Sequence, residues 1–136
     1  MNHGLEEYAK YFLEVSSEQR LKIIQLINEK KFRLSELAKI LDATTPEVHR
    51  NLDRLEKSGF IVKDADGNFV LTALGDMILA VIPNFAFIIE NKNYFIEHPI
   101  DSLPGKFILR LGELFQGKFI SSYVTVFEYW KNIYEN

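Results

Sequence analysis

The chain has 136 residues, of which 47% are hydrophobic and 26% charged, so it has the composition of a folded protein with a core rather than of a disordered one. The absence of cysteine excludes a disulfide framework, a thiolate zinc site and a cysteine nucleophile. The formal net charge of −3 gives no overall basic signature.

The two halves of the chain differ in composition. Residues 1–68 carry 11 basic and 12 acidic side chains, whereas residues 69–136 carry 5 and 7. Nine of the 11 phenylalanines lie at Phe60 or later. This asymmetry predicts a solvent-facing or partner-facing module followed by a module for packing or assembly.

The first two predicted helices lie within residues 5–30. Apolar residues recur at helical spacing over 5–13, which predicts a short amphipathic helix. Ser16 and Gln19 form a capping-box pattern, so Ser16 is the expected N-cap of the next helix. The expected inward residues of that second helix, which ends near Lys30 and Lys31, are Leu21, Ile24, Leu26 and Ile27.

Two more helices and a hairpin are predicted over residues 35–71. Ser35 is the expected cap of a short helix, and Thr45-Pro46 restarts a helix because proline is favoured at the first helical position. In this helix Val48, Leu52 and Leu55 form the predicted buried stripe, and Gly59 is the expected C′ residue. Two β-prone runs, 60–63 and 68–71, flank the turn-forming sequence Asp64-Ala65-Asp66-Gly67 and predict a hairpin.

The rest of the chain predicts further helices. Thr72 caps a helix that we expect to run to Ile82 and to be interrupted by Pro83. Helices are also expected over 104–115 and 121–134. The longest apolar stretch is cut by Pro83 and falls short of the roughly 20 residues of a membrane span. Because the N-terminus also lacks the pattern of a signal peptide, we expect a soluble cytoplasmic protein.

The order helix, short helix, turn, helix and hairpin over residues 17–71 is typical of a winged helix-turn-helix. The predicted fold class is therefore mainly α with a small β-hairpin wing, followed by C-terminal helices. An α-helix fits the major groove of B-DNA, and the exposed side of the 46–58 helix offers arginine, lysine, histidine and asparagine side chains. Threonines at its N-terminus suit phosphate contacts. The expected DNA-binding residues are Lys30, Lys31, Arg33, Ser35, Thr44, Thr45, Glu47, His49, Arg50, Asn51, Arg54, Lys57 and Lys63.

Two segments resemble known families. Residues 35–41 and 46–61 resemble the winged helix-turn-helix of archaeal regulators related to the ArsR and TrmB groups. Residues 94–104 and 109–114 resemble the segment after the winged helix in archaeal methanogenesis-type (filament-formation) regulators. The resemblance implies a cytoplasmic DNA-binding transcription regulator that forms a dimer.

The chain departs from these families in two ways. Members usually continue into a larger effector domain, whereas this chain stops at Asn136, so it is either a piece of a longer protein or a short member without a complete sensor. The tip of its wing carries Asp64 and Asp66 where lysine or arginine is common. We therefore expect the 46–58 helix and the cluster Lys30, Lys31 and Arg33 to dominate DNA binding.

Domain organisation follows from these elements. We expect residues 1–15 to form an N-terminal helix that can serve as a dimer arm, 16–82 the winged helix-turn-helix domain, and 83–136 a helical segment for packing or dimerisation. The predicted partners are double-stranded DNA and a second copy of the chain.

Other interpretations stay open at this point. The charges of the 46–58 helix can be a solvated surface whose members pair with one another. The helix can also face a protein, which makes the chain a winged-helix adaptor without sequence-specific DNA binding. The aromatic residues of the second half predict a core or dimer interface, with a hydrophobic effector pocket as the alternative.

The sequence offers no sign of catalysis. It contains no glycine-rich phosphate loop and no G-x-S-x-G elbow. The histidines His3, His49 and His98 lie far apart, and His98 beside Pro99 is expected to be a loop or packing residue. We therefore predict no enzyme, no cofactor and no metal site.

Overall fold

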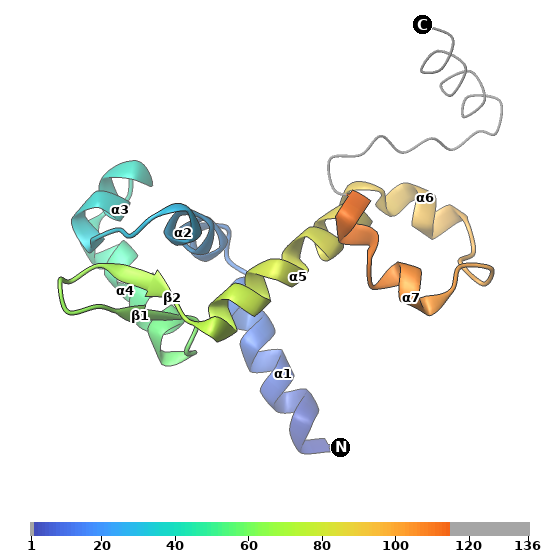
Figure 1. The fold of residues 1–136 in the computed structure, drawn as a ribbon, viewed down its shortest axis with the longest axis horizontal. Helices are drawn as coiled ribbons and strands as arrows, with labels where there is room; N and C mark the ends of the chain where they lie inside the picture. The colour runs from blue at the N-terminus through green and yellow to red at the C-terminus, as the bar shows by residue number, and fades with distance from the viewer. Residues whose placement is uncertain (1, 115–136) are drawn as a thin grey trace, which may run out of the picture. The chain divides into compact units, whose positions relative to one another are not determined.

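The computed structural model describes residues 2–114, and the chain divides into two compact units, Met1–Ala80 and Val81–Asn136 (Figure 1). The first unit contains α1 (Asn2–Val15), α2 (Glu18–Glu29), α3 (Leu34–Ile40), α4 (Thr45–Lys57), β1 (Ile61–Lys63) and β2 (Phe69–Leu71). Helix α5 (Ala73–Glu90) begins in the first unit, and the second unit continues with α6 (Lys92–Glu97), α7 (Gly105–Ile108) and the 3-10 helix η1 (Leu111–Leu114). The predicted fold class, mainly α with a small hairpin, is confirmed.

The core of the first unit lies between α2, α3, α4 and the hairpin. Val48, Leu52 and Leu55 on α4 are each at most 1% exposed, so the predicted stripe is confirmed. On α2 the buried residues are Arg20, Ile23, Ile24 and Ile27, whereas the predicted Leu21 and Leu26 are only half-buried. The prediction for α2 is therefore correct for Ile24 and Ile27. It missed Ile23 and the buried Arg20.

Two predicted caps are corrected by the structure. The N-cap of α2 is Ser17, whose Oγ accepts from Arg20 N at 3.4 Å, whereas Ser16 Oγ donates to Leu13 O at 2.8 Å and so closes α1. Helix α3 begins two residues earlier than predicted, with Arg33 as its N-cap and Ser35 inside its first turn. Both errors arise because several adjacent residues are able to begin the helix.

Helix α4 begins at Thr45, one residue before the predicted Pro46, and its N-cap is Thr44, whose Oγ1 accepts from Glu47 N at 3.4 Å. The predicted hairpin and the predicted end of α4 are confirmed. Strands β1 and β2 pair antiparallel, with Val62 opposite Val70. Gly59 has a φ of +79°, the left-handed conformation expected of a residue that ends a helix.

Helix α5 corrects the prediction that Pro83 ends it, because the helix continues through Pro83 to Glu90. The proline removes one backbone donor from the helix. On the following turn, Asn84 Oδ1 accepts from Gly112 N at 2.8 Å, which fixes η1 against this part of α5. A Cβ on Gly112 would lie 2.6 Å from Asn84 N, so only glycine permits this approach.

The remaining part of the second unit also differs from the prediction. Helix α6 occupies residues 92–97, for which the sequence analysis predicted no helix. The helix expected over 104–115 is divided into α7 and η1. The helix expected over 121–134 lies outside the described residues.

By length and composition alone, α5 could cross a membrane, since its 18 residues have a mean hydropathy of 1.7. One such helix is weak evidence, because the core helix of a soluble protein satisfies the same criteria.

Candidate nucleic-acid interface

Helix α4 presents an exposed side opposite its buried stripe. His49 and Arg50 are both exposed in its first half, and Lys57 is exposed in its last turn. Lys57 Nζ lies 2.7 Å from Asp53 Oδ2, so these two charges neutralise each other. Among the residues that the structure describes, Arg50 has no ion-pair or hydrogen-bond partner, which leaves it as the unpaired cation of α4.

The N-terminus of α4 adds hydroxyl groups next to Arg50. Thr44 and Thr45 are exposed, and Thr44 already accepts a hydrogen bond from the first turn. Pro46 has no N–H and Glu47 N is bonded to Thr44 Oγ1, so this end of α4 offers a phosphate the hydroxyl and N–H of Thr45 and the partial positive charge of the helix. The structure therefore brings Thr44, Thr45, His49 and Arg50 together in the first two turns of one helix.

The predicted DNA contacts Glu47 and Asn51 face the protein instead of the exposed side. Glu47 Oε1 accepts from Gln19 Nε2 at 3.1 Å. The Asn51 amide donates to Gln19 Oε1, and Asn51 Oδ1 accepts from Arg20 Nη1 at 3.2 Å. These bonds join α4 to the first turns of α2.

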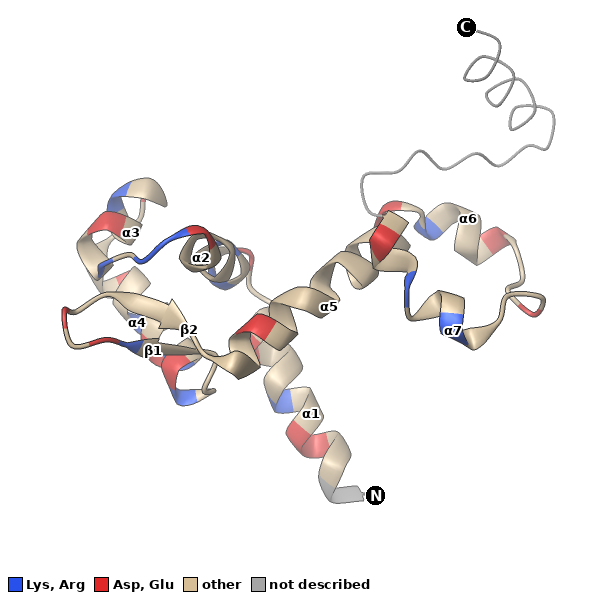
Figure 2. Ribbon diagram, viewed as in Figure 1, with Lys and Arg blue, Asp and Glu red and all other residues tan. Residues whose placement is uncertain are grey.

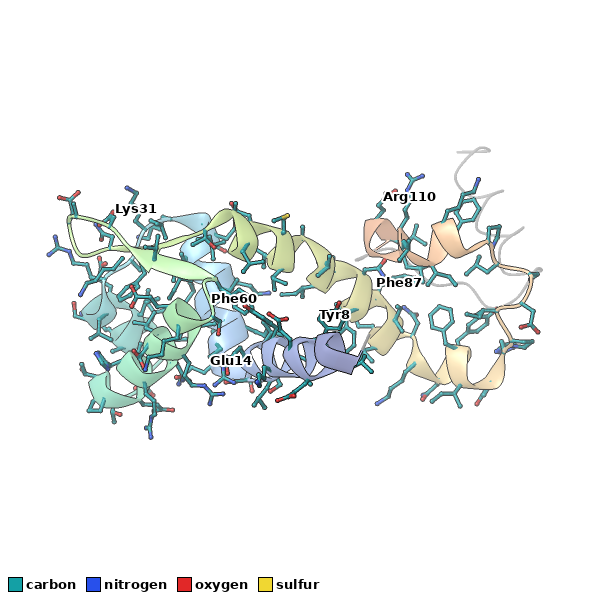
Figure 3. All side chains as sticks on the ribbon, turned by 90° about the horizontal axis from the view of Figure 1, so that it is seen from below. Tyr8, Glu14, Lys31, Phe60, Phe87 and Arg110 are labelled. Atoms are coloured by element: carbon teal, nitrogen blue, oxygen red, sulfur yellow. The ribbon has the colours of Figure 1, made fainter. Side chains whose placement is uncertain are left out.

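Arg54 is held by α1. Its Nε and Nη2 donate to the two carboxylate oxygens of Glu14 at 2.9 and 3.0 Å, a bidentate pair. Figure 3 labels Glu14 on α1. The Arg54 hydrogen bonds hold the pKa of Glu14 below its usual range, against the opposing effect of burial. Arg54 thus fixes α1 to α4.

Arg20 lies at the centre of this network and is only 6% exposed. Its guanidinium donates to the carbonyl oxygens of Leu13 and Glu14 and to Asn51. Burial lowers the pKa of Arg20, although an arginine stays protonated in such a site. The end of α1, the start of α2 and the middle of α4 therefore share one buried cation.

The basic residues near the wing have partners of their own. Lys31 Nζ lies 3.3 Å from Asp64 Oδ2, Lys30 lies over the ring of Phe32, and Lys63 lies over the ring of Phe69. Arg33 and Ser35 are exposed at the start of α3, and they complete the set of predicted contacts there. Lys30, Lys31 and Arg33 lie between α2 and α3, Ser35 in the first turn of α3 and Lys63 at the end of β1.

Asp64, one of the acidic residues of the wing, stabilises the turn of the hairpin. Its Oδ1 accepts from the backbone N–H groups of Asp66 and Asn68 at 3.0 and 2.9 Å, which builds the turn. The Asn68 hydrogen bond is the main cause that lowers the pKa of Asp64, with Lys31 adding to it. In Figure 2 the ribbon at the tip of the hairpin is red, the colour of aspartate and glutamate. Asp66 is exposed there and its charge would repel phosphate.

Sequence reasoning missed Glu14, Gln19 and Arg20 as partners of α4. No local pattern in the sequence indicates these contacts. Asp64 was expected in the turn, and the structure adds its ion pair with Lys31.

Three helices α2, α3 and α4, followed directly by an antiparallel hairpin, define a winged helix-turn-helix protein. The sequence matches the family of the HVO_A0261 N-terminal domain over residues 9–93, and the chain belongs to that family. The finer resemblance to the ArsR and TrmB groups and to methanogenesis-type regulators stays a prediction.

Several solved structures are similar in fold. The IdeR of T. acidophilum is 20% identical with a TM-score of 0.45; the similarity covers 74% of this chain and 54% of that one, so the chain spans about half the length of IdeR. The adhesin competence repressor AdcR of Streptococcus pyogenes is 18% identical with a TM-score of 0.46, over 93% of this chain and 94% of that one. A comparison with curated proteins gave no match.

Proposed function

We propose that the chain is a DNA-binding transcription regulator that acts in the cytoplasm and places the exposed side of α4 in the major groove. The observation that carries this proposal is the position of Arg50 and His49. Both side chains are exposed in the first half of α4, while the opposite side of the helix is buried in the core. A helix held in this way can present side chains to base edges and phosphates without rearranging.

The side-chain network divides the predicted contacts into two groups. Arg50 and His49 are available to bases, and Thr44 and Thr45 to a phosphate. We assign Asn51 and Arg54 to holding α4 against α2 and α1, since their polar atoms already have protein partners. Lys57 contributes little net charge beside Asp53.

Arg50→Ala is expected to weaken binding to the cognate duplex by about tenfold or more, because one good base or phosphate contact contributes roughly 1–3 kcal/mol. Fluorescence anisotropy against the duplex upstream of the protein's own gene, with a scrambled duplex beside it, measures the effect. Arg50→Lys is the matched control: it keeps the charge, so it should retain the salt dependence while losing discrimination between the duplexes. A binding curve of Arg50→Ala that superimposes on that of the wild type would contradict the assignment.

The paired charges favour one alternative function. Lys57, Arg54 and Lys31 each face a carboxylate, so few cations are left for phosphates. A winged-helix adaptor, which binds a protein through α4, fits this low free charge. Absence of binding to either duplex at about 50 mM salt would favour the adaptor, because phosphate contacts are strongest at low salt.

We also propose that the chain is a homodimer in which α1 serves as an arm, together with residues 83–136. The apolar side of α1 is uncovered, with Leu5 at 68%, Tyr8 at 60% and Phe12 at 73% exposure. Exposed apolar surface of this kind marks interaction sites. A two-fold axis would place two α4 helices on half-sites about 34 Å apart.

Phe12→Glu is expected to convert the dimer into monomers, since it places a charge in the centre of that apolar surface. Light scattering after gel filtration measures the mass. The control is Lys10→Ala, which alters a residue of α1 that pairs with Glu6. An unchanged mass for Phe12→Glu would exclude α1 as the dimer arm.

A further inference from the structure

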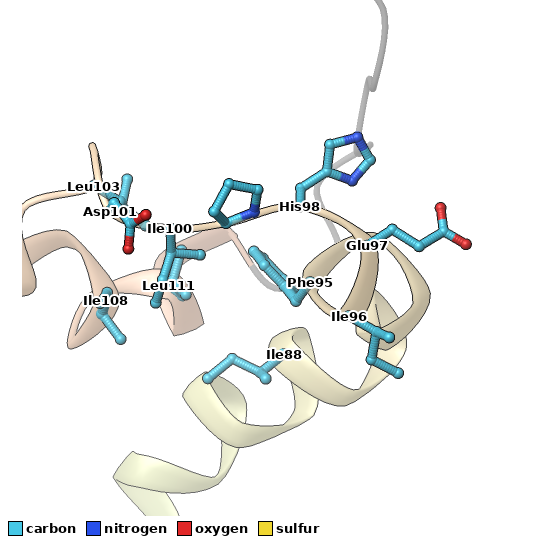
Figure 4. Close-up of a pocket in the computed structure, with 11 residues that line it drawn as sticks. Ile88, Phe95, Ile96, Glu97, His98, Ile100, Asp101, Leu103, Ile108 and Leu111 are labelled. Carbon is cyan, nitrogen blue, oxygen red and sulfur yellow. The ribbon is translucent and has the colours of Figure 1, made fainter.

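The second unit contains a hollow that the proposed DNA contacts do not use. The cavity has a volume of about 590 Å³, within the range of roughly 300–1,000 Å³ that is common for small-molecule sites. Its walls are mostly apolar, with Ile88, Phe95, Ile108 and Leu111 from four different elements (Figure 4). All of its lining residues belong to the second unit.

Among the described residues, the carboxylates of Glu97 and Asp101 are the charged groups of aspartate, glutamate, lysine or arginine in the lining of this cavity. Glu97 and Asp101 are exposed residues of its lining, and Figure 4 shows them at separate positions around the apolar side chains. In the part of the chain that the structure describes, neither carboxylate has an ion-pair or hydrogen-bond partner, and the lining contains no lysine or arginine. An anionic ligand would therefore meet uncompensated negative charge.

His98, also at the cavity, supplies no donor for an anion when it is neutral. Its Nδ1 lies 3.0 Å from Tyr94 O, and because a carbonyl only accepts, Nδ1 carries the proton and donates. The ring also stacks on Tyr94 with centroids 4.1 Å apart. This confirms His98 as a packing residue and leaves Nε2 of the neutral ring as an acceptor.

An aromatic ring adds a second preference for positive charge. The ring of Phe95 lies among the apolar residues of the cavity (Figure 4). The face of an aromatic ring attracts cations, and this attraction grows when water is excluded. A cation whose charge is spread over a large apolar body loses less hydration on entering such a site than a compact ammonium does.

We propose that this cavity binds an apolar organic cation. The apolar walls cover its body, Phe95 contacts its positive charge, and Glu97 and Asp101 attract it at the surface. The proposal does not rest on the DNA-binding function, since it concerns other residues and another ligand.

Two ions of the same shape and opposite charge test the proposal. Titration calorimetry on the full chain compares tetraphenylphosphonium with tetraphenylborate, which present the same four phenyl groups. We expect the phosphonium ion to bind at least tenfold more tightly than the borate. Equal affinity for both ions would overturn the proposal, because binding would then be hydrophobic only.

Substitutions of the lining residues test whether the phosphonium ion binds in this cavity. The double variant Glu97→Gln and Asp101→Asn should lower the affinity for the phosphonium ion several-fold, while Asp66→Asn in the wing should leave it unchanged. Ile108→Trp, which fills the hollow, should remove the binding while the circular dichroism spectrum is retained. Unchanged affinity in both of these cavity variants would overturn the site.

Absence of binding by either ion to the wild-type chain would also overturn the proposal. It would favour a protein segment, from this chain or a second copy, as the occupant of the hollow. The comparison of the two ions uses the wild-type chain, so it tests the preference for a cation even if a variant fails to fold.

Discussion

Arg20→Leu is expected to lower the free energy of unfolding by about 3 kcal/mol, a large part of the stability of a small domain. The side chain is 6% exposed and donates to Leu13 O at 2.9 Å and to Asn51 Oδ1 at 3.2 Å. Leucine fills part of the space but leaves Asn51 Oδ1 and the Glu14 carbonyl without this donor, while Leu13 O keeps the hydrogen bond from Ser16 Oγ. The loss of α1 from the body of the first unit should accompany the loss of stability.

Urea denaturation followed by circular dichroism measures the effect of Arg20→Leu. Lys22→Leu is a matched control, because Lys22 is an exposed residue of the same helix and should change stability by less than about 0.5 kcal/mol. The loss of stability in Arg20→Lys should lie between those of the other two variants, because lysine keeps the charge but lacks the planar guanidinium that donates to three acceptors. An unchanged denaturation midpoint for Arg20→Leu would show that the buried cation does not hold the helices together.

Gly75→Ala is expected to destabilise the first unit by about 2 kcal/mol, because a single methyl group has no room there. A Cβ on Gly75 would lie 2.1 Å from Phe60 O, and backbone cannot move aside as a flexible side chain can. Phe60 O also accepts from Thr72 N at 3.0 Å. Any shift that relieves the contact therefore disturbs the joint between the hairpin and α5.

The same substitution at Gly105 is the control for Gly75→Ala. A Cβ on Gly105 meets nothing within 4 Å, so Gly105→Ala should leave the thermal midpoint close to that of the wild type. Both variants add one methyl group to a helical residue, so a difference between their thermal midpoints reports the room available for that methyl group. Equal midpoints for the two variants would mean that the contact between α5 and Phe60 relaxes without cost.

The architecture of the first unit could be predicted because it depends on local patterns. The α4 stripe of Val48, Leu52 and Leu55 repeats at helical spacing, and the turn after Asp64 uses residues that accept only a few backbone conformations. Helix starts were less certain where Ser16 and Ser17 compete for one cap. The path of α5 through Pro83 could not be predicted, because it depends on tertiary contacts around Asn84 that local sequence does not reveal.

The candidate site was less predictable than the fold. Arg50 and Arg54 are four residues apart on one helix and similar in sequence context, yet only Arg54 meets Glu14, which is 40 residues earlier in the chain. Such pairs depend on how helices cross, and neither periodicity nor composition indicates them. Which arginine of α4 stays exposed therefore depends on the packing of α1 and α2 on α4.

The bonds of Arg20 and Arg54 also have a mechanical consequence for the proposed dimer. They fasten both sides of the bend at Ser16 and Ser17, so the bend cannot act as a hinge. In the proposed dimer, each α1 would be a rigid arm whose C-terminal end is bonded to α4, the helix that we propose to bind DNA. The two α1 helices would then set the distance between the two α4 helices. A DNA site whose half-sites lie at a different distance would have to bend or twist to bind.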